Sequence, residues 1–212
     1  MLKTYQTLAN TVIISNKNNR LIRFDDSLKL VGTGRSAYAF KIKSTNKVMK
    51  VFFPAFVHIA KEEAEIYEVL QDIPYFPTMY EAGSNYIVMD FIEGHTLFEC
   101  LTHGIRITSD RIKEIDYALS LASDKGLNPS DIHLRNIFLT SNGDIKIIDV
   151  ARFRQTKDCT QWCDLKTAFH RLYLRRFFPK KISAVLLNIV AFLYKKRVNP
   201  KILMRTVKRP ST

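Results

Sequence analysis

Hydrophobic and polar positions mix at short period through most of the first half of the chain, as β-strands require. Turn-forming segments rich in Gly, Ser and Asn separate these runs, which cover residues 11–15, 20–24, 27–31, 37–43 and 47–53. From Glu63 to Leu70 the apolar residues recur at the helical period, and two prolines end this helix. A further apolar run, residues 86–91, precedes Gly94. This half of the chain is therefore predicted to be rich in strands.

Beyond Gly94 the apolar residues recur mainly at the helical period. A short helix is expected over residues 96–101. A longer helix is expected to follow, with Thr108 or Ser109 as its N-cap and Gly126 as its C-terminal stop. The apolar stripe of this longer helix consists of Ile112, Ile115, Leu119 and Ala122.

An Asn-Gly pair lies between two β-branched runs, residues 137–140 and 145–148, and predicts a β-hairpin. From Gln161 the pattern is helical almost to the end of the chain. The longest apolar stretch, residues 182–194, would span about 20 Å as a helix, less than the roughly 30 Å hydrocarbon core of a bilayer. We therefore expect a buried helix here and no transmembrane segment.

The composition is that of an ordinary globular protein. The chain has 212 residues, of which 46% are hydrophobic and 25% charged, and this length suits one large domain or two small lobes. Three cysteines cannot form a closed disulfide framework, which favours a reducing compartment, and the N-terminus lacks the apolar run of a signal peptide. The expectation is a cytoplasmic α+β protein.

Charge is distributed unevenly along the chain. Residues 1–150 hold 17 Lys or Arg and 18 Asp or Glu, a net charge of −1, whereas residues 151–212 hold 16 and 2, a net charge of +14. Such a field favours an acidic partner for the C-terminal third. RNA or DNA, an anionic lipid and an acidic protein all fit this expectation, and a solvated basic face without a dedicated partner is the alternative.

Two segments of the strand-rich half carry candidate phosphate-binding chemistry. Gly32 and Gly34 lie between two predicted strands, where they let the backbone approach a phosphate chain, although a tight hairpin turn explains a bare G-x-G equally well. Lys50 lies inside an apolar run that includes Val48, and an unpaired ammonium there is costly. Glu63 is the best partner because it shares the apolar face of the next helix. Glu62 and Glu65 are alternatives, as is a lysine that extends to water.

Three oxygen-bearing side chains surround the predicted hairpin. Asp131, Asn136 and Asp149 are separated by 5 and 13 residues, and the hairpin returns the chain so that Asp149 can lie beside Asn136. Such hard oxygen ligands suit Mg²⁺, which binds few protein oxygens and keeps phosphates and waters in its shell. The alternative is an Asx-turn, a solvated loop and a capping aspartate.

The order of these features resembles the protein kinase superfamily over about residues 28–165: Gly-rich hairpin, strand lysine, helix glutamate, D-x-x-x-x-N and strand-end aspartate. His133 is typical of a D-x-H-x-x-N branch. The chain is thus similar to short atypical bacterial serine/threonine kinase-like proteins of Bacillus type, with Rio/Bud32-like and aminoglycoside-phosphotransferase-like affinity. The resemblance implies a bilobal kinase-like domain over residues 1–212, with a strand-rich N-lobe (1–89), a hinge (90–94) and a truncated helical C-lobe (95–212).

The resemblance also implies a role for each candidate. Asp131 would accept the proton of the acceptor hydroxyl, and Asn136 and Asp149 would hold Mg²⁺. Glu63 would fix Lys50 against the ATP phosphates, and Asp164 would anchor the catalytic-loop backbone. The residues implied to bind ATP, including the hinge backbone around adenine, are Gly32, Gly34, Val48, Lys50, Glu63, Met89, Asp90 and Phe91.

Departures from the kinase pattern limit what the resemblance implies. Pro129-Ser130 stand where H-R-D kinases have His-Arg, Val150-Ala151 follow Asp149 in place of Phe-Gly, and no A-P-E sequence follows, which leaves little room for an activation segment. We expect an ATP- and Mg²⁺-dependent phosphotransferase whose first-choice acceptor is a protein serine or threonine. A small-molecule or lipid kinase, or a nucleotide-binding scaffold that acts through its basic C-terminal face, is the alternative.

Overall fold

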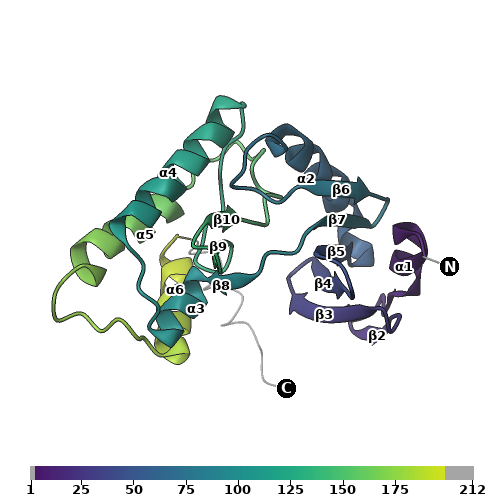
Figure 1. Cartoon of the computed structure of the whole chain (residues 1–212), viewed down its shortest axis with the longest axis horizontal. Coiled ribbons are helices and arrows are strands. Elements are labelled where there is room, and N and C mark those ends of the chain that lie inside the picture. The colour runs from purple at the N-terminus through teal and green to yellow at the C-terminus, as the bar shows by residue number, and fades with distance from the viewer. Residues whose placement is uncertain (1–2, 199–212) are drawn as a thin grey trace, which may run out of the picture.

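The computed structural model of the protein describes residues 3–198, with side chains to residue 195. Strands dominate the N-terminal part of the chain and helices the C-terminal part (Figure 1), so the α+β class predicted from the sequence is confirmed. In chain order the N-terminal elements are α1 (Tyr5–Thr11), β1 (Ile13–Ile14), β2 (Leu21–Arg23), β3 (Leu28–Thr33), β4 (Ala37–Ile42), β5 (Lys47–Phe52), a 3-10 turn (Pro54–Phe56), α2 (Val57–Leu70), β6 (Met79–Ala82) and β7 (Tyr86–Asp90).

A five-stranded antiparallel sheet of order β3-β4-β5-β7-β6 forms the centre of the N-terminal part. The pairing of β4 with β5 places Ala39 opposite Lys50, and the pairing of β5 with β7 places Ile87 on its other side. Helix α2 lies beside β6 and β7 in Figure 1 and buries Ile66, Tyr67 and Leu70. Lys50 is therefore held in the middle of a sheet that α2 covers.

Two N-terminal elements differ from the prediction. Residues 11–15 were expected to form a strand, but α1 ends at Thr11, and only Ile13 and Ile14 pair with β2. The Thr4 side chain accepts a hydrogen bond from the Thr7 N–H and caps α1. Strand β6 was not predicted. Its pairing with β7 makes it one of the two edge strands of the sheet, opposite β3.

The C-terminal part contains one small sheet, of order β10-β9-β8, among its helices. The Thr108 side chain accepts from the Arg111 N–H and caps α4, and Gly126 adopts φ +79° after that helix, as predicted. The β9–β10 hairpin is also confirmed. The elements are β8 (Gly94–Thr96), α3 (Leu97–His103), α4 (Ser109–Asp124), β9 (Ile137–Thr140), β10 (Ile145–Ile147), α5 (Gln161–Ala168), a π-helical turn (Phe169–Tyr173) and α6 (Ala184–Val198).

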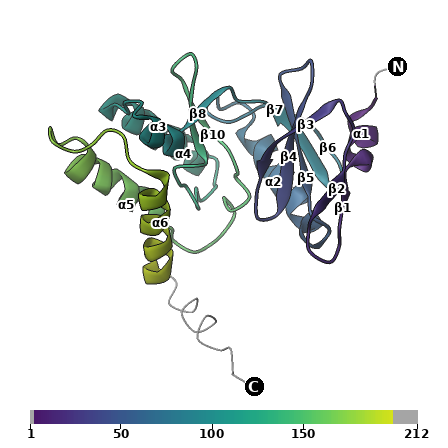
Figure 2. The same cartoon turned by 90° about the horizontal axis from the view of Figure 1, so that it is seen from below.

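One continuous hydrophobic core joins the two parts of the chain. It runs from Ile66 and Leu70 of α2, through Leu97 of α3 and Ile115 of α4, to Ile147 of β10. In Figures 1 and 2 the five-stranded sheet lies at one end of the molecule and helices α3 to α6 at the other, with residues 91–93 leading from β7 to β8. This arrangement is compatible with a kinase-like fold of two lobes.

Helix α6 differs from its prediction in burial. A run of 13 apolar-rich residues was expected to be buried, because a helix that is hydrophobic all round usually is. Yet Val185 and Leu193 keep 69% and 58% of their surface exposed. Leu187 and Tyr194 are the half-buried side chains that pack inward. Within residues 3–198, no helix is both long enough and apolar enough to cross a membrane.

Gly94, at the start of β8, is expected to be sensitive to substitution. Its φ is +148°, and a Cβ atom there would lie 2.3 Å from the Leu139 carbonyl oxygen. Gly94→Ala should therefore lower the free energy of unfolding by about 2 kcal/mol or more, measured by urea denaturation. Gly126→Ala is the control: its φ is +79° but no atom lies within 4 Å of the added Cβ, so its loss should stay near 1 kcal/mol. Equal losses would contradict the clash.

Candidate functional site

A cavity of about 630 Å³ lies between the five-stranded sheet and the β8–β10 region. Residues from both parts of the chain form its walls, since β3, β4, β5, α2, the 91–94 connection and the end of β10 all contribute. The wall includes every residue that the sequence predicted to bind nucleotide or metal: Gly32, Gly34, Val48, Lys50, Glu63, Met89, Asp90, Phe91, Asn136 and Asp149.

Lys50 is the centre of a charged triad in this cavity. Its Nζ lies 2.8 and 2.7 Å from the two carboxylate oxygens of Glu63 and 3.1 Å from Oδ1 of Asp149. The Glu63 side chain is fully buried, whereas 42% of the Asp149 side chain is exposed to the cavity and solvent. The predicted pairing of Lys50 with Glu63 is confirmed, and the third partner comes from a residue 99 positions away.

Lys50 attracts both carboxylates of this triad, whereas burial, followed by repulsion from Asp149, raises the pKa of Glu63 despite the attraction of Lys50. Burial alone lowers the pKa of the Lys50 ammonium, but attraction by Glu63 and Asp149 outweighs it, so its pKa is raised. The Lys50 charge is likewise the largest influence on Asp149 and lowers the pKa of that carboxyl. At neutral pH the cavity thus holds a cation with an ionised carboxylate that faces the open side.

Asp149 and Asn136 are positioned by the ends of the β9–β10 hairpin. The Ile148 N–H donates to the Asn136 carbonyl at 2.8 Å, and the Asp149 N–H donates to the Tyr67 hydroxyl at 3.3 Å. Asn136 is 5% exposed and donates its side-chain amide to the Asp131 carbonyl at 3.2 Å. Its Oδ1 is therefore the end of the amide that remains available as a ligand.

Both aspartates predicted to carry chemistry have unusual backbones. Asp131 and Asp149 adopt φ values of 60° and 61°, in the left-handed region that few residues other than glycine enter. Such strain persists only where the surrounding structure enforces it, and it is concentrated at functional sites. This feature, invisible in the sequence, distinguishes the two carboxylates from ordinary surface aspartates.

Asp131 lies at the edge of the cavity and not in its wall. The Arg35 guanidinium, from the turn between β3 and β4, donates to the Asp131 carboxylate at 2.8 Å, and Arg152 Nε lies 3.5 Å from the same oxygen. Burial lowers the pKa of the nearby His133 imidazole, so that ring is neutral at pH 7. Sequence reasoning missed both arginines, because no motif connects either of them to Asp131, and Arg35 is 96 positions away in the chain.

Some polar groups of the predicted hinge, residues 90–94, already form hydrogen bonds within the protein. The Asp90 carboxylate accepts from the Thr78 N–H and from the Tyr80 hydroxyl, and the Phe91 N–H donates to the Asn46 carbonyl at 2.8 Å. These bonds fix the backbone of the connection beside β5. They also occupy the Phe91 N–H, so this group is not free to donate to a ligand in the cavity.

The donor set of the cavity fits Mg²⁺ better than a metal held by the protein alone. Among the described residues no group of three or more His, Cys, Asp or Glu side chains is placed to hold a metal. Asn136 and Asp149 instead offer one amide oxygen and one carboxylate, both hard ligands. Mg²⁺ commonly takes one or two protein ligands and completes its shell with phosphates and water.

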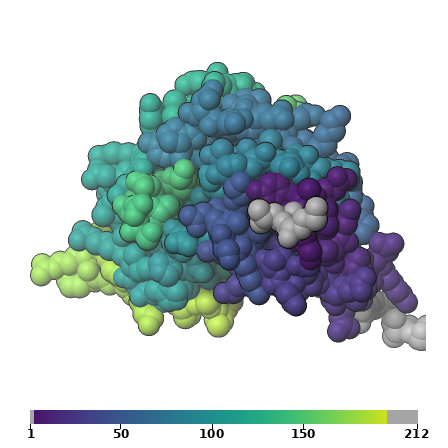
Figure 3. Space-filling model, turned by 45° about the vertical axis from the view of Figure 1, so that its right-hand side comes forward, coloured from purple at the N-terminus to yellow at the C-terminus, as the bar shows by residue number. Residues whose placement is uncertain are grey.

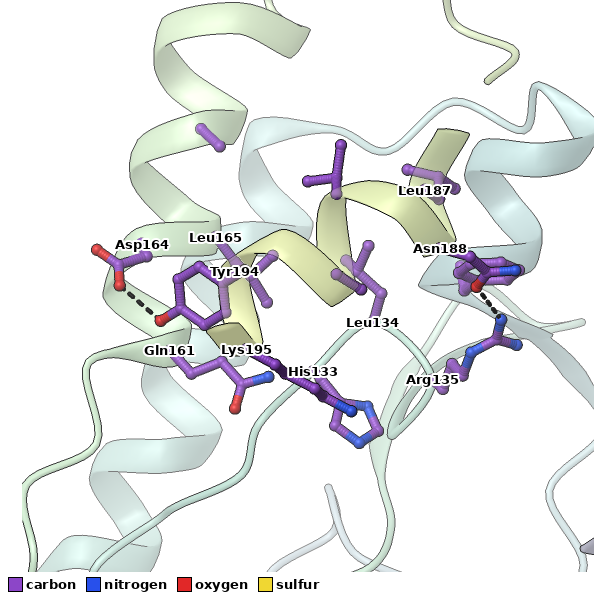
Figure 4. A pocket seen from close by; sticks show the side chains of 14 residues that line it. His133, Leu134, Arg135, Gln161, Asp164, Leu165, Leu187, Asn188, Tyr194 and Lys195 are labelled. Carbon is purple, nitrogen blue, oxygen red and sulfur yellow. Dashed lines mark hydrogen bonds between the residues drawn. The ribbon is translucent and has the colours of Figure 1, made fainter. Parts of the chain in front are cut away.

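A second cavity, of about 270 Å³, lies beneath α6 (Figure 4). Leu134 and His133 of the loop after Asp131 form part of its wall, and Arg135 donates to Oδ1 of Asn188 at 3.0 Å. Asp164 was expected to anchor the catalytic-loop backbone. It instead accepts from the Tyr194 hydroxyl at 2.7 Å and so connects α5 to α6. The Arg135–Asn188 hydrogen bond likewise connects α6 to the loop that follows Asp131.

Comparison with known proteins agrees with this geometry. No family model matches the chain. It is 49% identical over 201 residues, 92% of this chain and 93% of the relative, to a Bacillus subtilis (strain 168) protein named "Putative serine/threonine-protein kinase YrzF". It is also 28% identical over 127 residues to 3-phosphoinositide-dependent protein kinase 1 of Arabidopsis thaliana, a match that covers 58% of this chain and 26% of the plant protein. A "Probable serine/threonine-protein kinase" of Streptomyces coelicolor is 30% identical over 97 residues, 40% of this chain and 14% of that protein.

The fold and the lysine–carboxylate triad therefore define a protein of the kinase-like class. Within that class, the near-complete match in length and identity shows that the chain belongs to the family of the Bacillus subtilis protein. The predicted resemblance to the kinase superfamily is confirmed at this level. Affinity to the Rio/Bud32-like and aminoglycoside-phosphotransferase-like branches stays a prediction.

Proposed function

We propose that this protein is a phosphotransferase that moves the γ-phosphate of ATP to a protein serine or threonine hydroxyl with the help of Mg²⁺. The observation that carries the proposal is the cavity in which Lys50 contacts Glu63 and Asp149 beside Gly32 and Gly34. The names of its relatives favour a protein substrate over a small molecule. We also propose the division into an N-lobe (1–89), a hinge (90–94) and a C-lobe (95–212).

Each proposed role follows from the contacts of the residue. Lys50 offers an ammonium to phosphate oxygens, and Glu63 holds it from the buried side so that it cannot turn to water. Gly32 and Gly34 supply a backbone without Cβ atoms above the same space. Asn136 and Asp149 would hold Mg²⁺, which when bound neutralises charge on the phosphate oxygens.

The acceptor would enter at the edge of the cavity. Asp131 lies there and would accept the proton of the acceptor hydroxyl as the new phosphate ester forms. Because its carboxylate contacts Arg35 and Arg152, the acceptor must displace or share these contacts. Exposed ion pairs of this kind contribute about 0–1 kcal/mol, so they yield easily to a substrate.

The direct test is transfer of labelled phosphate from ATP to protein. Full-length protein incubated with γ-labelled ATP and Mg²⁺ should label itself or lysate proteins at serine or threonine, and chelation of Mg²⁺ should abolish the label. If label appears only in the lipid or small-molecule fractions, the acceptor is a lipid or a small molecule and not a protein. Complete absence of Mg-ATP binding would overturn the proposal itself.

Asp149→Asn should weaken Mg-ATP binding by at least about tenfold. The change removes the carboxylate charge that both Lys50 and the proposed metal use, and an amide is a weaker ligand for Mg²⁺. Calorimetric titration with ATP, with and without Mg²⁺, measures the effect: the loss should be large with the metal and small without it. Asp144→Asn, in the exposed turn of the same hairpin, is the control. Equal affinities for wild type and Asp149→Asn would refute the assigned role.

A further inference from the structure

An apolar stripe on α6 faces away from the other residues that the structure describes. Val185, Leu186, Ile189 and Leu193 keep 69, 52, 49 and 58% of their surface exposed. Val185, Ile189 and Leu193 are four residues apart and so share one side of the helix. Leu187 and Tyr194 point to the other side, toward Leu134 and Asp164 (Figure 4). We call the first four residues the α6 stripe.

Basic residues flank the α6 stripe along the chain. Lys181 precedes α6 and is exposed, whereas Lys195, in the last turn of α6, is exposed at the rim of the inner cavity beside His133 (Figure 4). Residues 171–198 contain no Asp or Glu, and their Lys and Arg residues are Arg171, Arg175, Arg176, Lys180, Lys181, Lys195, Lys196 and Arg197. The predicted basic side chains Lys196 and Arg197, like the chain from 199 on, lie outside the described side chains. The combination is therefore an exposed apolar helix inside a strongly positive segment.

We propose that this part of the protein binds the surface of a bilayer that contains anionic lipid. Helix α6 has 15 residues and a length of about 22 Å, which is too short to span a bilayer but suits a helix lying in its plane. The α6 stripe would enter the boundary between headgroups and acyl chains, while the lysines and arginines meet the headgroups. In Figure 3 the yellow-green atoms of the C-terminal part lie at the lower edge of the molecule.

The positive charge around the α6 stripe favours a lipid surface over the other partners that could cover it. A second copy of the chain would bring the same positive segment against it. Residues 199–212 would do so too, because they hold Lys201, Arg205, Lys208 and Arg209 and no acidic residue. A nucleic acid would satisfy the charge but would leave the aliphatic side chains in water. Anionic lipid fits both the exposed aliphatic side chains and the positive charge. It buries the former and attracts each basic residue near the surface by about 1 kcal/mol.

Flotation of the full-length protein with vesicles tests the proposal. We expect binding to vesicles of phosphatidylcholine with about one-third phosphatidylglycerol, and at least tenfold weaker binding to phosphatidylcholine alone. The triple variant Val185→Ser/Ile189→Ser/Leu193→Ser keeps every charge yet should bind the anionic vesicles at least tenfold less tightly, because it removes three inserted aliphatic groups. Ile22→Ser is the matched control, because Ile22 is 63% exposed on β2 at the other end of the molecule.

A second variant addresses the charge. Arg176→Gln/Lys181→Gln, which replaces two exposed basic residues that precede α6, should weaken anionic-vesicle binding several-fold and make the remainder less sensitive to salt. Thermal melting of each variant checks that it is folded. The proposal is overturned if the triple serine variant binds like the wild type. It is equally overturned if the wild type ignores vesicles but binds RNA, or if it forms a dimer in light scattering that the triple variant loses.

Discussion

Asp131→Asn is expected to lower phosphate transfer by about 10²–10⁴-fold, the contribution of a positioned general base, with nearly unchanged affinity for Mg-ATP. Asp131 lies outside the wall of the cavity that contains every predicted nucleotide and metal residue. Its side-chain contacts are the two arginines at the cavity edge. An asparagine keeps the shape and tolerates the φ of 60°, but it cannot accept the proton of an acceptor hydroxyl.

Two measurements on the same protein decide this prediction. Calorimetry should give similar Mg-ATP affinities for wild type and Asp131→Asn, while the rate of phosphate transfer falls. Asp110→Asn provides the control, because 87% of the Asp110 side chain is exposed on α4, where it pairs with Lys113. A wild type that binds ATP without transfer to any acceptor, and that Asp131→Asn matches, would indicate a nucleotide-binding scaffold.

Local sequence signals predicted those parts of the structure that local interactions determine. The α4 cap at Thr108, the stop at Gly126 and the β9–β10 hairpin depend on residues a few positions apart. The Lys50–Glu63 pair was predictable for a different reason. A buried ammonium needs a carboxylate, and the adjacent helix offered one on its buried face.

Features set by distant parts of the chain were not predictable. No sequence signal connects Arg35 to Asp131, which are 96 positions apart, or reveals the left-handed backbone of Asp149. The burial of α6 was predicted wrongly because composition reports how apolar a helix is, and not whether another element covers it. Within residues 3–198, α3, α5 and the loop after Asp131 cover the inner side of α6 and leave its outer side exposed.

Removing one carboxylate of the charged triad should have the second large effect, a loss of stability. Glu63→Leu should lower the free energy of unfolding by about 3 kcal/mol, because it leaves the Lys50 ammonium in the sheet with Asp149 as its remaining carboxylate. Urea denaturation measures the loss. Glu62→Leu, one position away on the exposed side of α2, should change the free energy of unfolding by less than about 0.5 kcal/mol.

The double variant Lys50→Met/Glu63→Leu separates stability from function. Apolar residues of similar size often replace a buried ion pair without loss, since the charges no longer need to be removed from water. We therefore expect the double variant to regain stability to within about 1 kcal/mol of the wild type, with Asp149 still solvated at 42% side-chain exposure. Mg-ATP binding should nevertheless stay lost, because no ammonium faces the phosphates. A double variant that binds Mg-ATP normally would show that the buried pair has only a structural role, and a double variant less stable than Glu63→Leu would show that the pair is needed for folding.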